Sequence, residues 1–252
     1  MTASRQRPYE IGLEEDAANY LPRSPLTVSE RRPYIYPDRL AVVHCARRYS
    51  WSESYARSRR LASALKQLGV EKGDTVATIL NNTPEMFECH FGVPACGAVL
   101  NTINTRLDAE AVAFILNHAE AKVLLTDREF ARMVKKAIEL ANRPDMIVID
   151  VDDSEYTGPG DRVGTLEYEA VLASGAADFV FEQPADEWDA ISLNYTSGTT
   201  GDPKGVALSH ANLLANIRAW GRAAALGPQD VCVSWLPLYH DMGLIGTWLG
   251  RG

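Results

Sequence analysis

The sequence contains few cysteines, and their arrangement excludes two classes of small protein. Its four cysteines form no Cys-x-x-Cys pair and have no histidine at metal-ligand spacing, so they indicate neither a disulfide framework nor a zinc site. Scattered thiols of this kind are typical of a reducing compartment. We therefore expect a cytoplasmic protein in which side chains form no metal site.

Long apolar runs and an excess of positive charge are also absent. No apolar stretch approaches the roughly 20 residues that span a bilayer, so we expect no membrane crossing. The 25 lysines and arginines are outnumbered by 33 aspartates and glutamates, and the resulting net charge of -8 disfavours a nucleic-acid partner. A small anionic ligand is compatible with this charge, because a local group of backbone N–H donors can hold a phosphate.

Apolar periodicity predicts an α/β fold with mainly parallel sheets flanked by helices. Strand patterns alternate with amphipathic helix patterns, as in βαβ units. A hairpin is expected at 40–44 and 47–51. Further strands are expected at 74–80, 122–126, 146–150, 190–195 and 205–208. Helices are expected at 52–68, 84–98 and 130–141, after Asp108, and from Ser209 to Arg222.

The first 39 residues differ in composition from the rest of the chain. They contain five prolines among mixed polar residues. Because proline removes a backbone donor and restricts the backbone, this composition favours an irregular arm over a helix or a central strand. We therefore predict an irregular N-terminal arm over residues 1–39 and a folded domain over residues 40–252.

One loop is rich in the residue types that bind phosphate. The segment Tyr195-Thr-Ser-Gly-Thr-Thr-Gly-Asp-Pro-Lys-Gly205 contains three glycines, three threonines, a serine and a lysine. Glycines allow several N–H groups to point at one centre, hydroxyls add donors, and the lysine adds a positive charge. These groups together indicate a polyphosphate-binding loop, although the same residue types also dominate ordinary hairpin turns.

Two familiar nucleotide-binding motifs do not fit this loop. A Walker A motif requires Gly-Lys-Ser/Thr at a fixed distance after the first glycine, and that triplet is missing. The nearest Gly-x-Gly, at Gly158 and Gly160, lies in an acidic stretch and lacks the third glycine of a dinucleotide-binding fingerprint. A P-loop kinase or ATPase and a dinucleotide-binding protein are therefore disfavoured.

The ordered string resembles the signature of the adenylate-forming superfamily, which includes acyl-CoA synthetases, fatty-acyl-AMP ligases, luciferases and peptide-synthetase adenylation domains. In that family the loop holds the β- and γ-phosphates of ATP, with Mg²⁺ beside them. The resemblance implies that the phosphate-contacting residues here are Thr196, Ser197, Gly198, Thr199, Thr200, Gly201 and Lys204. It also implies that residues 40–252 are the N-terminal portion of an AMP-binding domain.

A second segment, Trp235-Leu-Pro-Leu-Tyr-His-Asp-Met-Gly-Leu244, resembles the next motif of the same family, in which an aromatic residue and a histidine line the acyl site. The resemblance assigns His240 to the catalytic site, and a core or capping histidine is the alternative. His44, His90 and His118 lie on expected helices and strands and are predicted to be structural.

The implied activity is ATP-dependent conversion of a carboxylic acid, expected to be a fatty acid, to an acyl-adenylate and then to a CoA thioester. Segments 73–76 and 97–107 resemble short- and medium-chain acyl-CoA synthetases, whereas 209–217 and 235–243 resemble fatty-acyl-AMP ligases that load acyl carrier proteins. The phosphopantetheine of a carrier protein is thus the alternative acceptor. The family's C-terminal domain lies beyond this sequence, so we expect the chain alone to be inactive, and a catalytically silent remnant is the other alternative.

Overall fold

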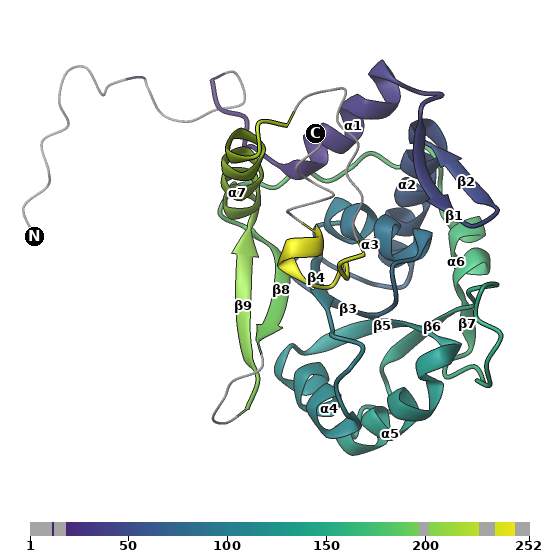
Figure 1. Ribbon diagram of the computed structural model, residues 1–252. Coiled ribbons are helices and arrows are strands. Elements are labelled where there is room, and N and C mark those ends of the chain that lie inside the picture. Colours follow the sequence, from purple (N-terminus) through teal and green to yellow (C-terminus); the bar gives the residue numbers. More distant parts are fainter. Residues whose placement is uncertain (1–11, 13–18, 197–201, 227–234, 245–252) are drawn as a thin grey trace, which may run out of the picture.

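The computed structural model describes residues 12, 19–196, 202–226 and 235–244. A seven-stranded sheet with strand order β7-β6-β5-β3-β4-β8-β9 crosses the molecule (Figure 1). All neighbouring strands in it are parallel except β8 and β9, which are antiparallel. The strands are β3 (Thr75–Ile79), β4 (Val99–Thr102), β5 (Ala121–Asp127), β6 (Ile147–Val151), β7 (Leu166–Glu167), β8 (Ala190–Thr196) and β9 (Lys204–Ser209).

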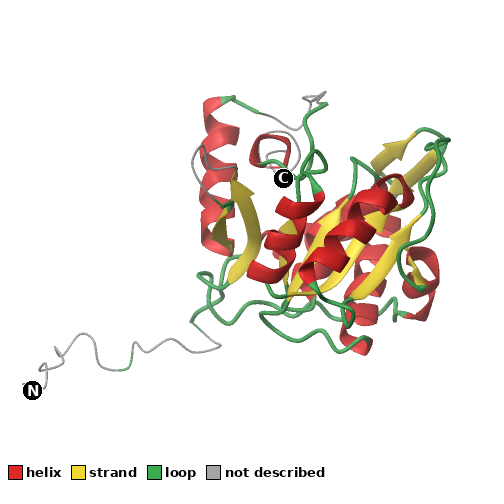
Figure 2. Cartoon of the chain, turned by 90° about the horizontal axis from the view of Figure 1, so that it is seen from below, coloured by secondary structure: helices red, strands yellow, loops and turns green. Residues whose placement is uncertain are grey.

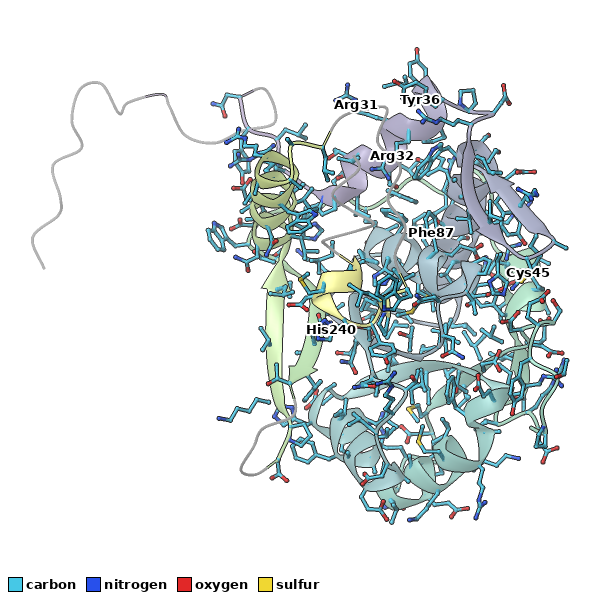
Figure 3. All side chains as sticks on the ribbon, in the orientation of Figure 1. Arg31, Arg32, Tyr36, Cys45, Phe87 and His240 are labelled. Carbon is cyan, nitrogen blue, oxygen red and sulfur yellow. The ribbon has the colours of Figure 1, made fainter. Side chains whose placement is uncertain are left out.

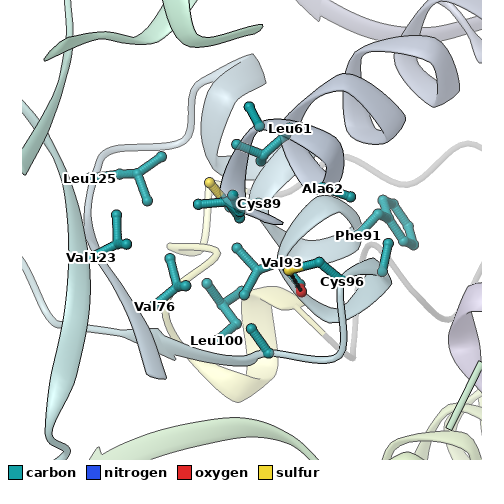
Figure 4. Close-up of a cluster of buried hydrophobic side chains, with 14 of the residues drawn as sticks. Leu61, Ala62, Val76, Cys89, Phe91, Val93, Cys96, Leu100, Val123 and Leu125 are labelled. Carbon is teal, nitrogen blue, oxygen red and sulfur yellow. Dashed lines mark hydrogen bonds between the residues drawn. The ribbon is translucent and has the colours of Figure 1, made fainter. Parts of the chain in front are cut away.

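Helices cover both faces of this sheet (Figure 2). The alternation of side chains along β3 separates the faces, because Val76 packs into one apolar cluster and Ala77 into the other. The first cluster contains residues of α2 (Trp51–Gln67), α3 (Pro84–Ala95) and α6 (Tyr168–Ser174), and the second contains residues of α4 (Ala109–His118) and α5 (Ala131–Ala141). Figure 4 shows Leu61, Cys89 and Phe91 with Val76 and Val123 in the first cluster.

Burial on both faces explains why the central strands read as continuous apolar runs. Every residue of β3 is buried, as is usual for a parallel strand between two helical layers. The helices begin at polar caps, since the Thr83, Asp108 and Ser209 side chains accept bonds from the backbone N–H groups of Met86, Ala111 and Asn212. The predicted α/β class with mainly parallel strands is confirmed.

A separate two-stranded hairpin lies outside the main sheet. It consists of β1 (Leu40–His44) and β2 (Arg47–Ser50), which pair antiparallel, and it packs beside the start of α2. The expected hairpin is confirmed, although Trp51 belongs to the helix and not to the strand. Ser50 and Glu53 form a capping box there, which fixes the start of α2.

The prediction of an irregular arm is wrong for part of residues 1–39. Pro25–Ile35 form helix α1, capped by the Ser24 side chain. Pro25 occupies the first turn, where a missing N–H costs nothing, and Pro33 lies in the last turn. The helix also has tertiary partners, because Ser24 Oγ lies 2.8 Å from His210 Nδ1 at the start of α7 (His210–Ala223). The number of prolines was therefore a poor guide here, because a helix tolerates proline at the positions that Pro25 and Pro33 occupy.

The predicted helix 84–98 is too long, and strand β4 was not expected. The helix ends at Ala95, and Gly97 has φ +80, a conformation that favours glycine and turns the chain into β4. The short elements β7 and α6 were not expected either. Between β5 and α5, a 3₁₀ turn covers Arg128–Phe130. No helix within the described ranges is long and apolar enough to cross a bilayer.

Two buried histidines make the stability of the fold sensitive to acid. Burial lowers the pKa of both His90 and His210 to about 4; a hydrogen bond with the Leu238 backbone partly opposes this for His90. The ordinary pKa of an unfolded histidine is about 6.5, so the unfolded chain takes up protons first as the pH falls. Their contribution to stability is complete above pH 6.5 and is lost between about pH 6.5 and pH 4.

We expect the free energy of unfolding to fall by about 2 kcal/mol per fully buried histidine between pH 7.5 and pH 5. Urea unfolding at these two pH values measures the effect. A His210→Gln variant, which keeps a polar partner for Ser24, should show a smaller fall than the unaltered protein. An equal fall in both proteins would contradict the assignment for His210.

Candidate functional site

The candidate site lies at one edge of the main sheet. Strands β3, β4 and β8 run parallel, so their carboxyl ends, at Ile79, Thr102 and Thr196, lie at the same edge. In open α/β sheets, ligands bind outside the carboxyl ends of the strands. Both segments singled out in the sequence are at this edge: residues 196–204 follow β8, and the segment 235–244 contacts the ends of β3 and β4.

The two ends of the expected phosphate loop lie opposite each other. Thr196, the last residue of β8, pairs with Lys204, the first residue of β9, and both side chains are exposed. This pairing places a hydroxyl and an ammonium group opposite each other at the two ends of the expected phosphate-binding segment. Ser197, Gly198, Thr199, Thr200 and Gly201 lie outside the described residues, so their role as phosphate ligands stays a prediction.

The tyrosine that precedes this loop packs against α4. The hydroxyl of Tyr195 lies 2.6 Å from His118 Nδ1, and the two rings meet edge to face at 5.7 Å. Phe114 stacks on the His118 ring, with ring centroids 5.4 Å apart. Burial raises the pKa of Tyr195, so its hydroxyl stays protonated at neutral pH. The helix thereby holds the strand residue next to Thr196.

His240, labelled in Figure 3, lies beside the end of the sheet, directly before a short helical turn at 241–244. Its side chain is 62% exposed, and its Nδ1 lies 2.5 Å from the Asp241 carboxylate. The backbone forms a turn here, since His240 N–H donates to the Pro237 carbonyl at 3.1 Å. The exposed imidazole is not a core histidine, but its Nδ1 accepts a bond from the Met242 N–H at 3.3 Å, as a capping residue does. The role of His240 in the acyl site stays a prediction.

Sequence reasoning missed the polar residues that hold this segment. Asn82 bonds the backbone of Leu236 and Leu238, and Thr102 bonds the carbonyl of Tyr239. The available signal was weak: Asn82 directly follows a buried strand, where ligand-binding residues are common, but asparagine is also frequent in turns. No sequence pattern indicated a role for Thr102, because strand β4 was not predicted.

The described residues contain no group of three or more His, Cys, Asp or Glu side chains that could hold a metal ion. A small pocket with mostly apolar walls lies between α3, β8 and α7, lined in part by His90, Phe91, Ile191, Leu213 and Leu244. Leu244 connects this pocket to the segment that carries His240. The walls of the pocket also include Leu100, the second residue of β4, so the pocket lies nearer the amino ends of β4 and β8 than their carboxyl ends.

Replacing Tyr195 by Phe removes the hydroxyl that contacts His118. We expect the free energy of unfolding to fall by about 1 kcal/mol, the usual net contribution of such a hydrogen bond. Tyr34→Phe is the matched control, because Tyr34 is 90% exposed and should tolerate the change. Urea unfolding of both variants measures the difference, and equal stabilities would show that the contact contributes nothing.

Comparison with known proteins identifies the family. A sequence profile described as AMP-binding enzyme matches residues 29–250. The chain is 40% identical over 264 residues to the peroxisomal acetate/butyrate–CoA ligase AAE7 of Arabidopsis thaliana, which covers 98% of this chain and 45% of that protein. It is 39% identical over 253 residues to the peroxisomal trans-cinnamate:CoA ligase of Petunia hybrida, covering 94% of this chain and 44% of the relative.

The fold is also that of a solved enzyme. The crystal structure of the anthranilate CoA ligase AuaEII in complex with anthranoyl-AMP superimposes with a TM-score of 0.78 at 23% identity, over 94% of this chain and 45% of that one. The chain thus spans less than half the length of the two curated relatives and of this structure. The resemblance inferred from the loop and the second motif is confirmed, and the chain belongs to the AMP-binding enzyme family.

Proposed function

We propose that this chain contributes the ATP-phosphate site and part of the acid site of an enzyme that activates a carboxylic acid with ATP and then forms a CoA thioester. The observation that carries the proposal is the pairing of Thr196, at the carboxyl end of β8, with Lys204, because these two residues flank the glycine- and threonine-rich segment. The membership of the AMP-binding family supports it.

In the proposed first step, a carboxylate oxygen attacks the α-phosphorus of ATP. A new oxygen–phosphorus bond forms, the bond from the α-phosphorus to the bridging oxygen breaks, and pyrophosphate leaves with its electron pair. In the second step a thiol attacks the acyl carbon, AMP leaves, and the thiol proton passes to solvent. The difficulty of the first step is the negative charge that accumulates on the departing pyrophosphate.

The residues of this chain are suited to that charge. Lys204 would place its ammonium group beside the β- and γ-phosphates, and the hydroxyl of Thr196 would donate to a phosphate oxygen at the base of the same loop. Mg²⁺ bound to the phosphates would supply further charge neutralisation. Phosphate oxygens and loop hydroxyls are hard oxygen ligands of the kind that Mg²⁺ prefers, so the residue types present fit this ion.

The proposal also covers which carboxylic acid is activated and which thiol accepts the acyl group. The relatives act on acetate or butyrate and on trans-cinnamate, so the predicted fatty acid is one of several carboxylic acids to test. Both relatives are CoA ligases, which favours CoA over the phosphopantetheine of a carrier protein as the acceptor. The cytoplasmic location stays a prediction, because both relatives are described as peroxisomal.

Lys204→Ala tests the phosphate site in the complete gene product. We expect acid-dependent exchange between ATP and pyrophosphate to fall roughly 100-fold, because a group that stabilises developing charge is removed. Lys204→Arg, which keeps the charge, should retain more activity than the alanine variant. The control is Lys136→Ala, since the exposed Lys136 of α5 pairs with the exposed Glu110 of α4. Exchange that is unchanged in Lys204→Ala would refute the proposal.

The acceptor is tested by offering CoA and a phosphopantetheinylated acyl carrier protein to the same enzyme in parallel. We expect a CoA thioester to form at least about ten times faster than an acyl carrier thioester, because the two curated relatives use CoA. Mass spectrometry of both products measures the ratio. A faster transfer to the carrier protein would replace CoA by the alternative acceptor, and release of acyl-adenylate without transfer would refute thioester formation.

A further inference from the structure

Asn82 holds the backbone just before His240 with both ends of its side-chain amide. Its Nδ2 donates to the Leu236 carbonyl at 3.0 Å, and its Oδ1 accepts from Leu238 N–H at 2.8 Å. The two bonds lie on either side of Pro237, whose ring already restricts the backbone. Asn82 itself lies between β3 and the cap of α3 at Thr83, so this contact joins the segment to a rigid part of the sheet edge.

A second contact reaches the next residue from strand β4. The Thr102 hydroxyl donates to the Tyr239 carbonyl at 3.3 Å and accepts from Asn194 Nδ2 at 3.0 Å. Asn194 is in turn fixed by Ser192, whose hydroxyl lies 2.6 Å from its Oδ1. Because Asn194 and Ser192 belong to β8, this chain of hydrogen bonds joins the strand that enters the phosphate loop to the backbone next to His240.

Apolar packing and a contact with a buried histidine also hold this segment against the core. Leu238 and Tyr239 pack against the first apolar cluster, and His90 in α3 hydrogen-bonds the Leu238 backbone. The His240 side chain, by contrast, is more than half exposed. The segment is therefore fixed through its backbone at positions 236, 238 and 239, and it presents the imidazole at the sheet edge without burying it.

We propose that Asn82 and Thr102 are positioning residues that fix the backbone of residues 236–239 and thereby place His240 at the acid site. This inference rests on the proposed function and on the assignment of His240 to the acyl site that the family resemblance implies. A shift of the segment should weaken binding of the acid more than binding of ATP, because neither substitution removes the backbone pairing of Thr196 with Lys204.

The chain supplies matched controls for both residues. Asn81→Ala is the control for Asn82→Ala, because Asn81 is also exposed but donates to the Glu129 side chain on the other side of β3. Thr78→Val is the control for Thr102→Val, because Thr78 is the register partner of Thr102 in β3, is also buried, and directs its hydroxyl to Met86 Sδ and not to residues 236–239. Valine keeps the shape and β-branching of threonine and removes the hydroxyl.

The first measurement is hydrogen exchange of the Leu238 amide in the complete protein, which requires no catalytic activity. Loss of its acceptor in Asn82→Ala should speed exchange of this amide roughly tenfold, with no change in Asn81→Ala. Asn82→Asp keeps the acceptor and loses the donor to Leu236, so it should protect the Leu238 amide better than alanine does. If Asn82→Ala does not fold, the two single variants Asn82→Asp and Thr102→Val are measured in its place.

The second measurement is steady-state kinetics. In Asn82→Ala and Thr102→Val, we expect the KM for the acid to rise about 5- to 10-fold, the effect of losing one or two neutral hydrogen bonds, and the KM for ATP to change less than 2-fold. Both controls should match the unaltered enzyme. A purely structural defect would lower the thermal midpoint and both substrate affinities together.

The outcomes separate this inference from the proposed function. Unchanged exchange of the Leu238 amide in Asn82→Ala would refute the backbone contact. Faster exchange with an unchanged KM for the acid would refute the positioning role while leaving the proposed function intact. An unaltered enzyme without acid-dependent ATP–pyrophosphate exchange would refute the proposed function and the role in acid binding, and the amide measurement would still decide whether Asn82 holds this segment.

Discussion

The parallel pairing of β4 with β8 is the constraint on which the candidate site depends. Leu100 pairs with Ser192 and Asn101 with Leu193, and the Asn101 side chain adds a bond of 2.7 Å to the Leu193 carbonyl. A buried amide is costly unless it is bonded, so this contact favours one register over its neighbours. With that register fixed, the end of β8 lies beside the ends of β3 and β4, and the phosphate loop shares an edge with the segment carrying His240.

The parts of the candidate site that give rigidity differ from the side chains proposed to react. Strands β3 and β4, which end at it, are buried, whereas Thr196, Lys204 and His240 are exposed. Such an arrangement suits a reaction that depends on positioning and charge neutralisation, since a packed scaffold holds groups that remain accessible to substrates. Two contacts hold the exposed groups in place relative to the sheet. Tyr195 bonds His118, and Asn82 bonds the backbone of residues 236–239.

Local patterns predicted most of the main helices and strands, and their failures have physical causes. The apolar character of α3 continues without a break into β4, so periodicity did not show where the helix ends; the turn at Gly97 decided it. The prolines near the N-terminus suggested an irregular arm, yet α1 forms because Pro25 occupies a permitted position and Ser24 caps the helix against His210. Both errors arose where a tertiary contact or a single glycine outweighed the average composition.

For the candidate site, the sequence by itself determined the α/β class, the order of groups in the loop from Thr196 to Lys204, and the nomination of His240, because these are properties of short segments. Only the tertiary structure decided that Thr196 and Lys204 face each other, that His118 meets Tyr195, and that Asn82 bonds Leu236 and Leu238. Asn82 and Leu236 are 154 residues apart in sequence. No local pattern specifies such a contact, since it follows from which strands pair and in what register.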